Sequence, residues 1–295
     1  MSASDCRPDR PEWFSRALSY PRVVDLVDVD GCRIAVTRWG DPDNPPLLMV
    51  HGRSANGSWW DHVAPLLADD YCVSALDLSG HGDSGWRPTY SYDGWASEVQ
   101  AVAGLAGHPI VIAHSFGGRL AVRAARRAPG RFAGLVLLDT NLSAQAPRAT
   151  DRSAPSRTDA GQAIRTYATF DEALAQFRLR GGGTTSARCI LEHIASRSLR
   201  RTPDGLIWKR DRRTNRPIDD RPGIDELCGV STSTALIRAE NGNVGPELLE
   251  AYRRILGPAA PIVELPASGH HLMLDQPLAL VAALRAVLFS LRELP

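Results

Sequence analysis

The chain has 295 residues, a formal net charge of +1 at pH 7, 43% hydrophobic residues and 23% charged residues. This length suits one large α/β domain, with or without an insertion, and the composition is that of an ordinary soluble globular protein. A nearly neutral chain with no long basic tract gives no electrostatic reason to expect nucleic acid or an anionic membrane as a partner.

Cysteine usage and the N-terminal segment bear on the compartment. The five cysteines are odd in number, far apart and never spaced as Cys-x-x-Cys; they are Cys6, Cys32, Cys72, Cys189 and Cys228. We therefore expect neither a disulfide framework nor a zinc site. Charged residues interrupt the first 22 positions, so we expect no signal peptide, and no later apolar run has the length of a membrane span. The sequence predicts a cytoplasmic protein.

Strand and helix patterns alternate along the first 139 residues. Residues 23–29 and 32–39 alternate apolar and polar side chains around Asp30-Gly31, which is a two-residue hairpin signal. Further strands are expected at 47–50, 71–76, 109–113 and 132–138, and helices at 13–18, 58–68, 92–105 and 116–128. This order predicts an α/β fold with a doubly wound, mostly parallel sheet and helices on both faces.

The pattern changes in the segment 140–228, which is polar, richer in arginine than in acidic residues and interrupted by three glycines at 181–183. We interpret it as a mainly helical cap inserted over the mouth of the sheet, between core segments 1–139 and 229–295. Its expected elements are helices at 170–179 and 186–199 and a small hairpin around Asp204-Gly205. The glycines are expected to form a flexible loop, with a lid hinge as the alternative. Strands at 233–239 and 261–265 and helices at 246–256 and 277–292 then complete the core.

The segment 109–118 reads Pro-Ile-Val-Ile-Ala-His-Ser-Phe-Gly-Gly and places Ser115 between a buried strand and a helix. The small residues Ala113 and Gly117 suit a sharp strand-to-helix turn, because larger side chains would collide with the neighbouring backbone. Such a turn lifts the hydroxyl clear of the sheet and directs the first helix amides at negative charge beside it. Polar residues also follow other predicted strands at this ligand-binding edge; they are His51, Asp77 and Asp139.

Four motifs, in this order, resemble the α/β-hydrolase superfamily over nearly the whole chain outside segment 140–228. They are His51-Gly52 with Trp60, Asp77 with Gly80-His81-Gly82 and Ser84, Ala113-His114-Ser115-Phe116-Gly117, and Gly269-His270 with Asp275-Gln276-Pro277. Each motif is weak alone, but the ordered set is specific. The resemblance implies the α/β-hydrolase fold, with Ser115 as the nucleophile of a catalytic triad on a nucleophile elbow.

A serine hydroxyl becomes a nucleophile at neutral pH only when a base removes its proton during attack. His270 is the expected base, because it lies in a glycine-containing loop after the last strand, where the resemblance places the catalytic histidine. His271 is the alternative if the loop adopts another register. The histidines of the turn motifs are expected to make structural hydrogen bonds; they are His51, His81 and His114.

The acid departs from the commonest pattern of the superfamily. That pattern has an aspartate in a Gly-x-x-Asp turn after the seventh strand, but the corresponding stretch here reads Ala239-Glu240-Asn241-Gly242-Asn243. Some branches, including certain haloalkane dehalogenases and lipases, place the acid at the end of the sixth strand, where this chain has Asp139. We therefore predict Asp139 as the acid, with Glu240, or no acid at all, as the alternative.

The backbone amides of Phe116 and Arg53 are expected to form the oxyanion hole. The expected activity is hydrolysis of a small-molecule carboxylic ester or lactone through an acyl-enzyme on Ser115, with no cofactor or metal required. Dehalogenation and epoxide opening are disfavoured, because those branches have an aspartate at this position. Carbon–carbon bond hydrolysis, thioester hydrolysis and perhydrolysis are alternatives with the same triad, and a hydrolase-like ligand receptor with little turnover is the alternative from another class.

Overall fold

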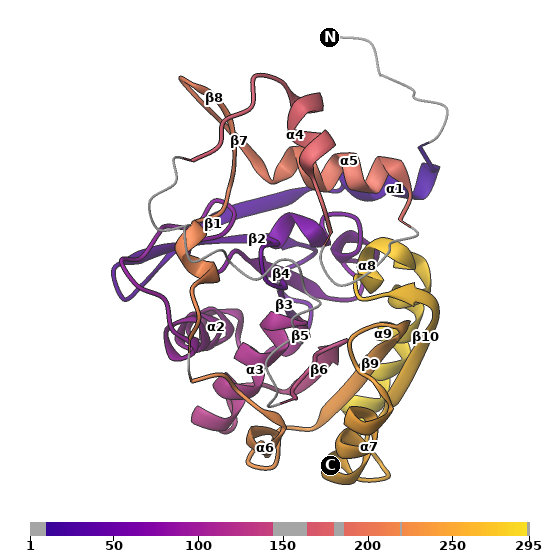
Figure 1. The fold of residues 1–295 in the computed structure, drawn as a ribbon. Coiled ribbons are helices and arrows are strands. Elements are labelled where there is room, and N and C mark those ends of the chain that lie inside the picture. The colour runs from indigo at the N-terminus through magenta and orange to yellow at the C-terminus, as the bar shows by residue number, and fades with distance from the viewer. Residues whose placement is uncertain (1–9, 144–163, 180–185, 219, 294–295) are drawn as a thin grey trace.

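The computed structural model describes residues 10–143, 164–179, 186–218 and 220–293 (Figure 1). The glycines at 181–183 and Cys6 lie outside the described residues. The four cysteines within these ranges carry free thiols. None of the helices in these ranges combines the length and the apolar character that a bilayer span requires.

An eight-stranded sheet runs through the middle of the molecule (Figure 1). Its strands in chain order are β1 (Arg22–Val29), β2 (Cys32–Trp39), β3 (Pro46–Val50), β4 (Cys72–Leu76), β5 (Ile110–His114), β6 (Gly134–Leu138), β9 (Thr234–Asn241) and β10 (Ile262–Gly269). Their spatial order is β1-β2-β4-β3-β5-β6-β9-β10. The pairs β1–β2 and β2–β4 are antiparallel, and all the remaining pairs of this sheet are parallel, which confirms the predicted mostly parallel sheet. The loops after the parallel strands therefore meet at one edge.

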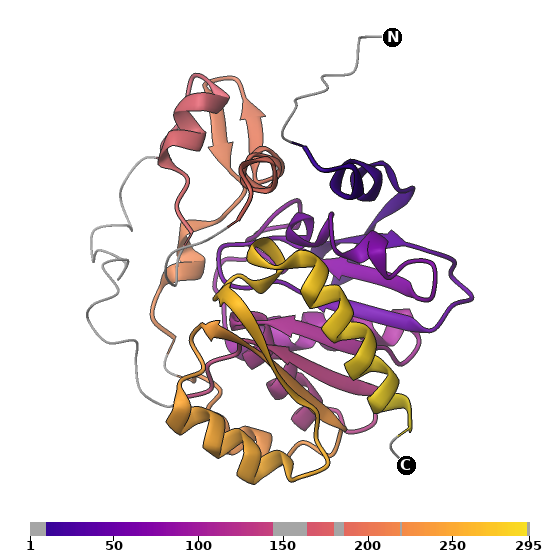
Figure 2. The same ribbon diagram turned by 90° about the vertical axis from the view of Figure 1, so that its right-hand side faces the viewer.

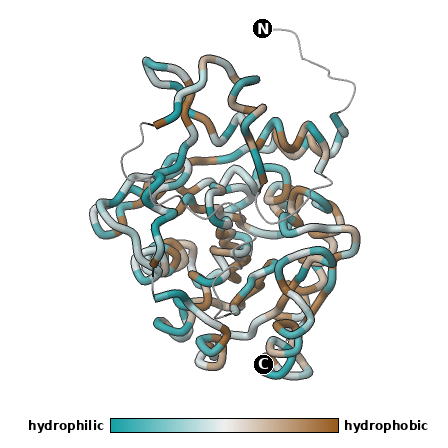
Figure 3. The backbone as a smooth tube through the Cα atoms, viewed as in Figure 1, coloured by the Kyte–Doolittle hydropathy of each residue, from teal (hydrophilic) through white to brown (hydrophobic). Residues whose placement is uncertain are grey.

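Helices cover both faces of the sheet (Figure 2). They are α1 (Glu12–Ser19), α2 (Tyr92–Ala106), α3 (Phe116–Arg127), α7 (Pro246–Leu256), α8 (Leu272–Asp275) and α9 (Pro277–Glu293). Alternate residues of β5 point to opposite faces: Ile110 and Ile112 join the buried cluster that includes α9, whereas Val111 and Ala113 join the one that includes α2 and α3. Hydrophobic residues accordingly concentrate along the central strands, and hydrophilic residues are frequent at the periphery (Figure 3).

The predicted helix over 58–68 is wrong. This stretch forms two short 3₁₀ helices, η1 (Gly57–Trp60) and η2 (Ala64–Leu66). Pro65 explains the break, because proline has no N–H and its ring would clash with the carbonyl four residues earlier in an α-helix. The apolar residues that suggested helical spacing are buried nonetheless, among them Trp60, Val63 and Leu67.

The chain between β6 and β9 carries its own elements, and Figures 1 and 2 place α4, α5, β7 and β8 together on one side of the core. The described elements are α4 (Phe170–Gln176), α5 (Arg188–Arg197), β7 (Leu199–Thr202), β8 (Gly205–Trp208), η3 (Arg212–Asn215) and α6 (Ile224–Leu227). As predicted, two helices and a small hairpin are present, although both helices are shorter than expected. Thr169 accepts a hydrogen bond from the Glu172 amide, which starts α4.

Two parts of this segment pack on the core. Ile190 and Ile194 of α5 join the buried cluster that contains Trp60. Leu227 of α6 joins the cluster on the opposite face, and Glu226 pairs with Arg123 of α3 at 2.6 Å. The segment is therefore attached to the sheet-and-helix core through apolar contacts at both of these places.

Candidate active site

Ser115 lies in the turn between β5 and α3, in a conformation that non-glycine residues seldom adopt (φ 53°, ψ −113°). Its amide donates to the Leu138 carbonyl at 3.0 Å, which ties the turn to the end of β6. A Cβ atom at Gly117 would lie 2.6 Å from the His51 carbonyl oxygen, so the close approach of the β3 loop requires glycine there. The turn thus holds a partly exposed serine where the parallel strands end.

His270 follows β10 directly, and its ring lies between Ser115 and Asp139. The His270 Nε2 to Ser115 Oγ distance is 2.8 Å, and the His270 Nδ1 to Asp139 Oδ2 distance is 2.6 Å. With its proton on Nδ1, the ring donates to the carboxylate, and Nε2 accepts from the serine hydroxyl. The ring of His271, the alternative base, instead lies edge-on against Trp59 at 5.2 Å between centroids. The structure therefore brings together the serine, the favoured histidine and the favoured acid.

Asp139 is completely buried at the end of β6, and a buried carboxylate needs hydrogen-bond partners. Its Oδ2 also accepts from the Asn243 amide at 2.7 Å, and its Oδ1 from the Ala239 amide at 3.3 Å. Both amides belong to the end of β9 or the loop after it. Asp139 at the end of β6 is thus held by the strand that carries the acid in the commoner arrangement of the superfamily.

Gly242 explains why that commoner position holds no side chain. A Cβ atom there would lie 2.5 Å from Asp139 Cγ and closer still to both carboxylate oxygens. Glu240, the alternative acid, is exposed, and its Oε2 accepts from the Ala267 amide at 2.7 Å. The carboxylate beside His270 Nδ1 is therefore that of Asp139.

The residues expected to form the oxyanion hole lie next to each other. Phe116 is the first residue of α3, so its amide has no acceptor within the helix. The loop that carries Arg53 lies against the same turn, because a Cβ atom at Gly52 would be 3.5 Å from Ser115 Cβ. The guanidinium of Arg53 stacks on the Phe116 ring at 4.1 Å, and its Nη1 donates to the Thr214 carbonyl at 2.7 Å.

The sequence analysis did not predict the contact between the Arg53 guanidinium and Thr214, because Thr214 belongs to η3, 161 positions after Arg53 in the chain. A second contact runs the other way: Arg210 Nη1 donates to Ser54 Oγ at 2.6 Å. Together they tie the inserted segment to the β3 loop. No motif in either segment signalled the pairing.

The histidines of the turn motifs make hydrogen bonds to the main chain. His51 Nδ1 donates to the Gly52 carbonyl at 2.7 Å, and its Nε2 accepts from the Leu78 amide at 3.0 Å. Burial lowers the pKa of His51 to about 4, so this ring stays neutral and joins the loops after β3 and β4. Burial also places the pKa of His81 well below its ordinary value, and its Nδ1 lies 3.2 Å from the Ser79 carbonyl oxygen.

Comparison with known proteins agrees with this architecture. Residues 47–284 match the profile of the Alpha/beta hydrolase family. The chain belongs to this family. Among curated relatives of this hydrolase, esterase Rv0045c of Mycobacterium tuberculosis is 28% identical over 86% of this chain and 86% of its own, and a serine hydrolase-like protein of Mus musculus is 28% identical over 69% and 70%.

Solved structures resemble this hydrolase over most of its length. One structure of the M. tuberculosis esterase Rv0045c, described together with transition-metal inhibition of that esterase, has a TM-score of 0.72 at 26% identity and covers 94% of this chain and 96% of its own. E-2-(acetamidomethylene)succinate hydrolase has a TM-score of 0.75 at 20% identity and covers 91% and 100%. At that identity the second likeness supports the fold alone.

Proposed function

We propose that this family member is a serine hydrolase that cleaves a carboxylic ester or lactone through an acyl-enzyme intermediate. The observation that carries the proposal is the hydrogen-bonded series from Ser115 Oγ through His270 to Asp139, with distances of 2.8 Å and 2.6 Å. The similarity to the esterase Rv0045c over 86% of both chains supports ester bonds as the target.

In the proposed mechanism, His270 Nε2 takes the hydroxyl proton as Ser115 Oγ attacks the carbonyl carbon. Asp139 holds the Nδ1 proton and stabilises the imidazolium that forms, while the Phe116 and Arg53 amides donate to the oxyanion. The imidazolium then protonates the leaving alkoxide, and the acyl group stays on Ser115. Water, deprotonated by the same Nε2, attacks the acyl-enzyme and releases the carboxylic acid and the free serine.

We further propose that segment 140–228 is a cap that bounds the substrate pocket. The contacts from Arg53 to Thr214 and from Arg210 to Ser54 support this role, since they join the segment to the loop that carries a proposed oxyanion donor. Substrate size would then depend on side chains of the segment as well as on the core.

A fluorophosphonate probe tests the proposal, because it phosphonylates only an activated serine. We expect one adduct per chain on Ser115, no adduct in Ser115→Ala, and hydrolysis of p-nitrophenyl esters that the same substitution abolishes. Folded protein without an adduct on Ser115 would support the ligand receptor instead. A panel of esters, lactones and thioesters of graded acyl size then identifies the preferred bond.

A further inference from the structure

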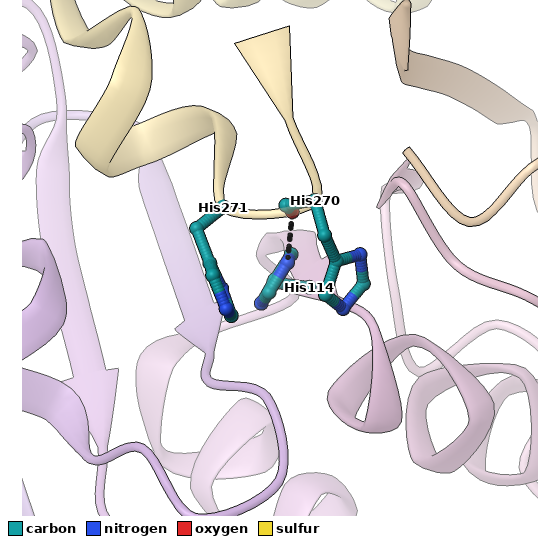
Figure 4. Close-up of side chains that lie close together, drawn as sticks. All are labelled: His114, His270 and His271. Carbon is teal, nitrogen blue, oxygen red and sulfur yellow. Dashed lines mark hydrogen bonds between the residues drawn. The ribbon is translucent and has the colours of Figure 1, made fainter. Parts of the chain in front are cut away.

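Three histidine side chains gather where the end of β5 meets the loop after β10 (Figure 4). They are His114, His270 and His271, and each offers a ring nitrogen that lies within 4.8 Å of the other two. All three are buried, with exposed fractions of 1%, 7% and 8%. In the described part of the chain, no other group of three His, Cys, Asp or Glu residues has this spacing.

The role of His270 accounts for one member of this group, but it leaves a nitrogen of His114 unexplained. The Nε2 of His114 donates to the main-chain oxygen of His270 at 2.8 Å, so its proton is on Nε2 and its Nδ1 carries a lone pair (Figure 4). This Nδ1 is buried and has no hydrogen-bond partner among the residues that the structure describes. A Cβ atom at Gly52 would lie 2.7 Å from it, so glycine at that position keeps a side chain away from the nitrogen. A buried acceptor without a partner is costly and needs an explanation.

We propose that His114, His270 and His271 form a binding site for a divalent transition-metal ion such as Zn²⁺, Ni²⁺ or Cu²⁺, and that the bound ion inhibits hydrolysis. Imidazole nitrogens suit these ions, whereas Mg²⁺ and Ca²⁺ prefer oxygen ligands. In a tetrahedral site with metal–nitrogen bonds of about 2.0–2.1 Å, the nitrogens lie about 3.3 Å apart, so ring nitrogens that lie within 4.8 Å of one another must approach by at most about 1.5 Å. Rotation of the side chains supplies this movement, and water completes the coordination.

Inhibition follows from which ring nitrogen of His270 can bind the ion. Its Nδ1 proton is held by Asp139, so the lone pair available to an ion is that of Nε2, which accepts from Ser115 in the metal-free protein. An ion on Nε2 occupies the lone pair that would take the serine proton. Metal binding and catalysis therefore exclude each other. The inhibitory effect rests on the proposed function, whereas binding of the ion does not.

The first experiment measures p-nitrophenyl ester hydrolysis by the full chain at increasing Zn²⁺, Ni²⁺ and Cu²⁺, with Mg²⁺ as the inactive ion and EDTA for reversal. Each variant is compared with its own metal-free rate. His271→Asn is expected to raise the half-inhibitory concentration of Zn²⁺ at least about tenfold, since even indirect ligand contacts are worth about 10–100-fold in affinity. The matched control is His108→Asn, which removes an exposed histidine at a positive φ that asparagine tolerates, and it should respond like the wild type.

The second experiment measures binding without activity. Co²⁺ bound by the wild type should give the visible absorption of a four-coordinate site, and His271→Asn should weaken it. X-ray absorption of the Zn²⁺-loaded wild type should show imidazole ligands, a readout that does not depend on how a variant folds. A metal site without histidine ligands, or Zn²⁺ affinity unchanged in folded His271→Asn, would overturn the site. Full ester turnover with the site loaded would overturn the inhibition, and absence of turnover in metal-free protein would refute the proposed function alone.

Discussion

Replacing Gly242 by alanine should disable the acid without touching any residue of the proposed triad. Gly242 does not have a positive φ, so alanine meets no backbone strain there. Its Cβ would lie 2.5 Å from Asp139 Cγ, and ordinary contact begins at 3.4 Å, so the carboxyl group must withdraw by about 1 Å. The 2.6 Å hydrogen bond to His270 cannot survive that displacement unchanged. A misplacement of this size costs about 100-fold in kcat, or about 2.7 kcal/mol of transition-state stabilisation.

The assay is steady-state hydrolysis of a p-nitrophenyl ester, with thermal unfolding measured in parallel. KM should change little, because Asp139 contacts the base rather than the substrate. The matched control is Gly245→Ala in the same loop, where an added Cβ has no atom of the described residues within 4 Å, and its kcat should equal that of the wild type. A folded Gly242→Ala variant with kcat within twofold of the wild type would show that the position of the Asp139 carboxylate does not control the rate. In the converse test, Gly242→Asp is added to the Asp139→Ala variant. The double variant should have a kcat at least about tenfold above that of Asp139→Ala alone, because the acid acts by orienting the histidine and not by its place in the chain.

Three further outcomes are expected. Asp139→Asn should lower kcat about 10⁴-fold, because a neutral amide favours the wrong imidazole tautomer and does not stabilise the imidazolium, while Glu240→Gln should leave kcat unchanged. Steady-state rates of the two variants check this, and the reverse result would move the acid to Glu240. Arg53→Ala should lower kcat/KM about 10–100-fold, since a hydrogen bond from a charged group, such as the one from Arg53 to Thr214, contributes about 1.5–3 kcal/mol. Partial rescue of kcat/KM by guanidinium salt below its denaturing range checks this prediction. An unchanged kcat/KM would contradict it. Burial lowers the pKa of His62 to about 4, so its contribution to stability is present above about pH 6.5 and falls by about 2 kcal/mol by about pH 5. Urea unfolding at both pH values should show a smaller loss for His62→Gln, and an equal loss would contradict the assignment.

Local patterns made much of this site predictable. The turn at Ser115, the loop at His270 and the end of β6 at Asp139 each carry their signal within a few residues, and a parallel sheet brings strand ends together whatever lies between them. Even the absent carboxylate at Gly242 was informative, because it led to the prediction of an acid on another strand.

Features that depend on packing between distant segments were not predictable. The stacking of Arg53 on Phe116 and its bond to Thr214 require the inserted segment to be in place. β10 also extends beyond the predicted strand. Its pairing with β9 is irregular between Leu265 and Gly269, where Ala267 has a positive φ that no sequence pattern indicated.

In the proposed mechanism, Ser115 carries the acyl group during turnover. Rapid mixing of the protein with an excess of p-nitrophenyl acetate, followed by acid quench and peptide mass spectrometry, tests it most directly. We expect a burst of about one equivalent of p-nitrophenolate and an acetyl group on the peptide that contains Ser115, and neither in Ser115→Ala. Turnover that persists in Ser115→Ala, or an acetyl group on another residue that forms and decays at the catalytic rate, would contradict it.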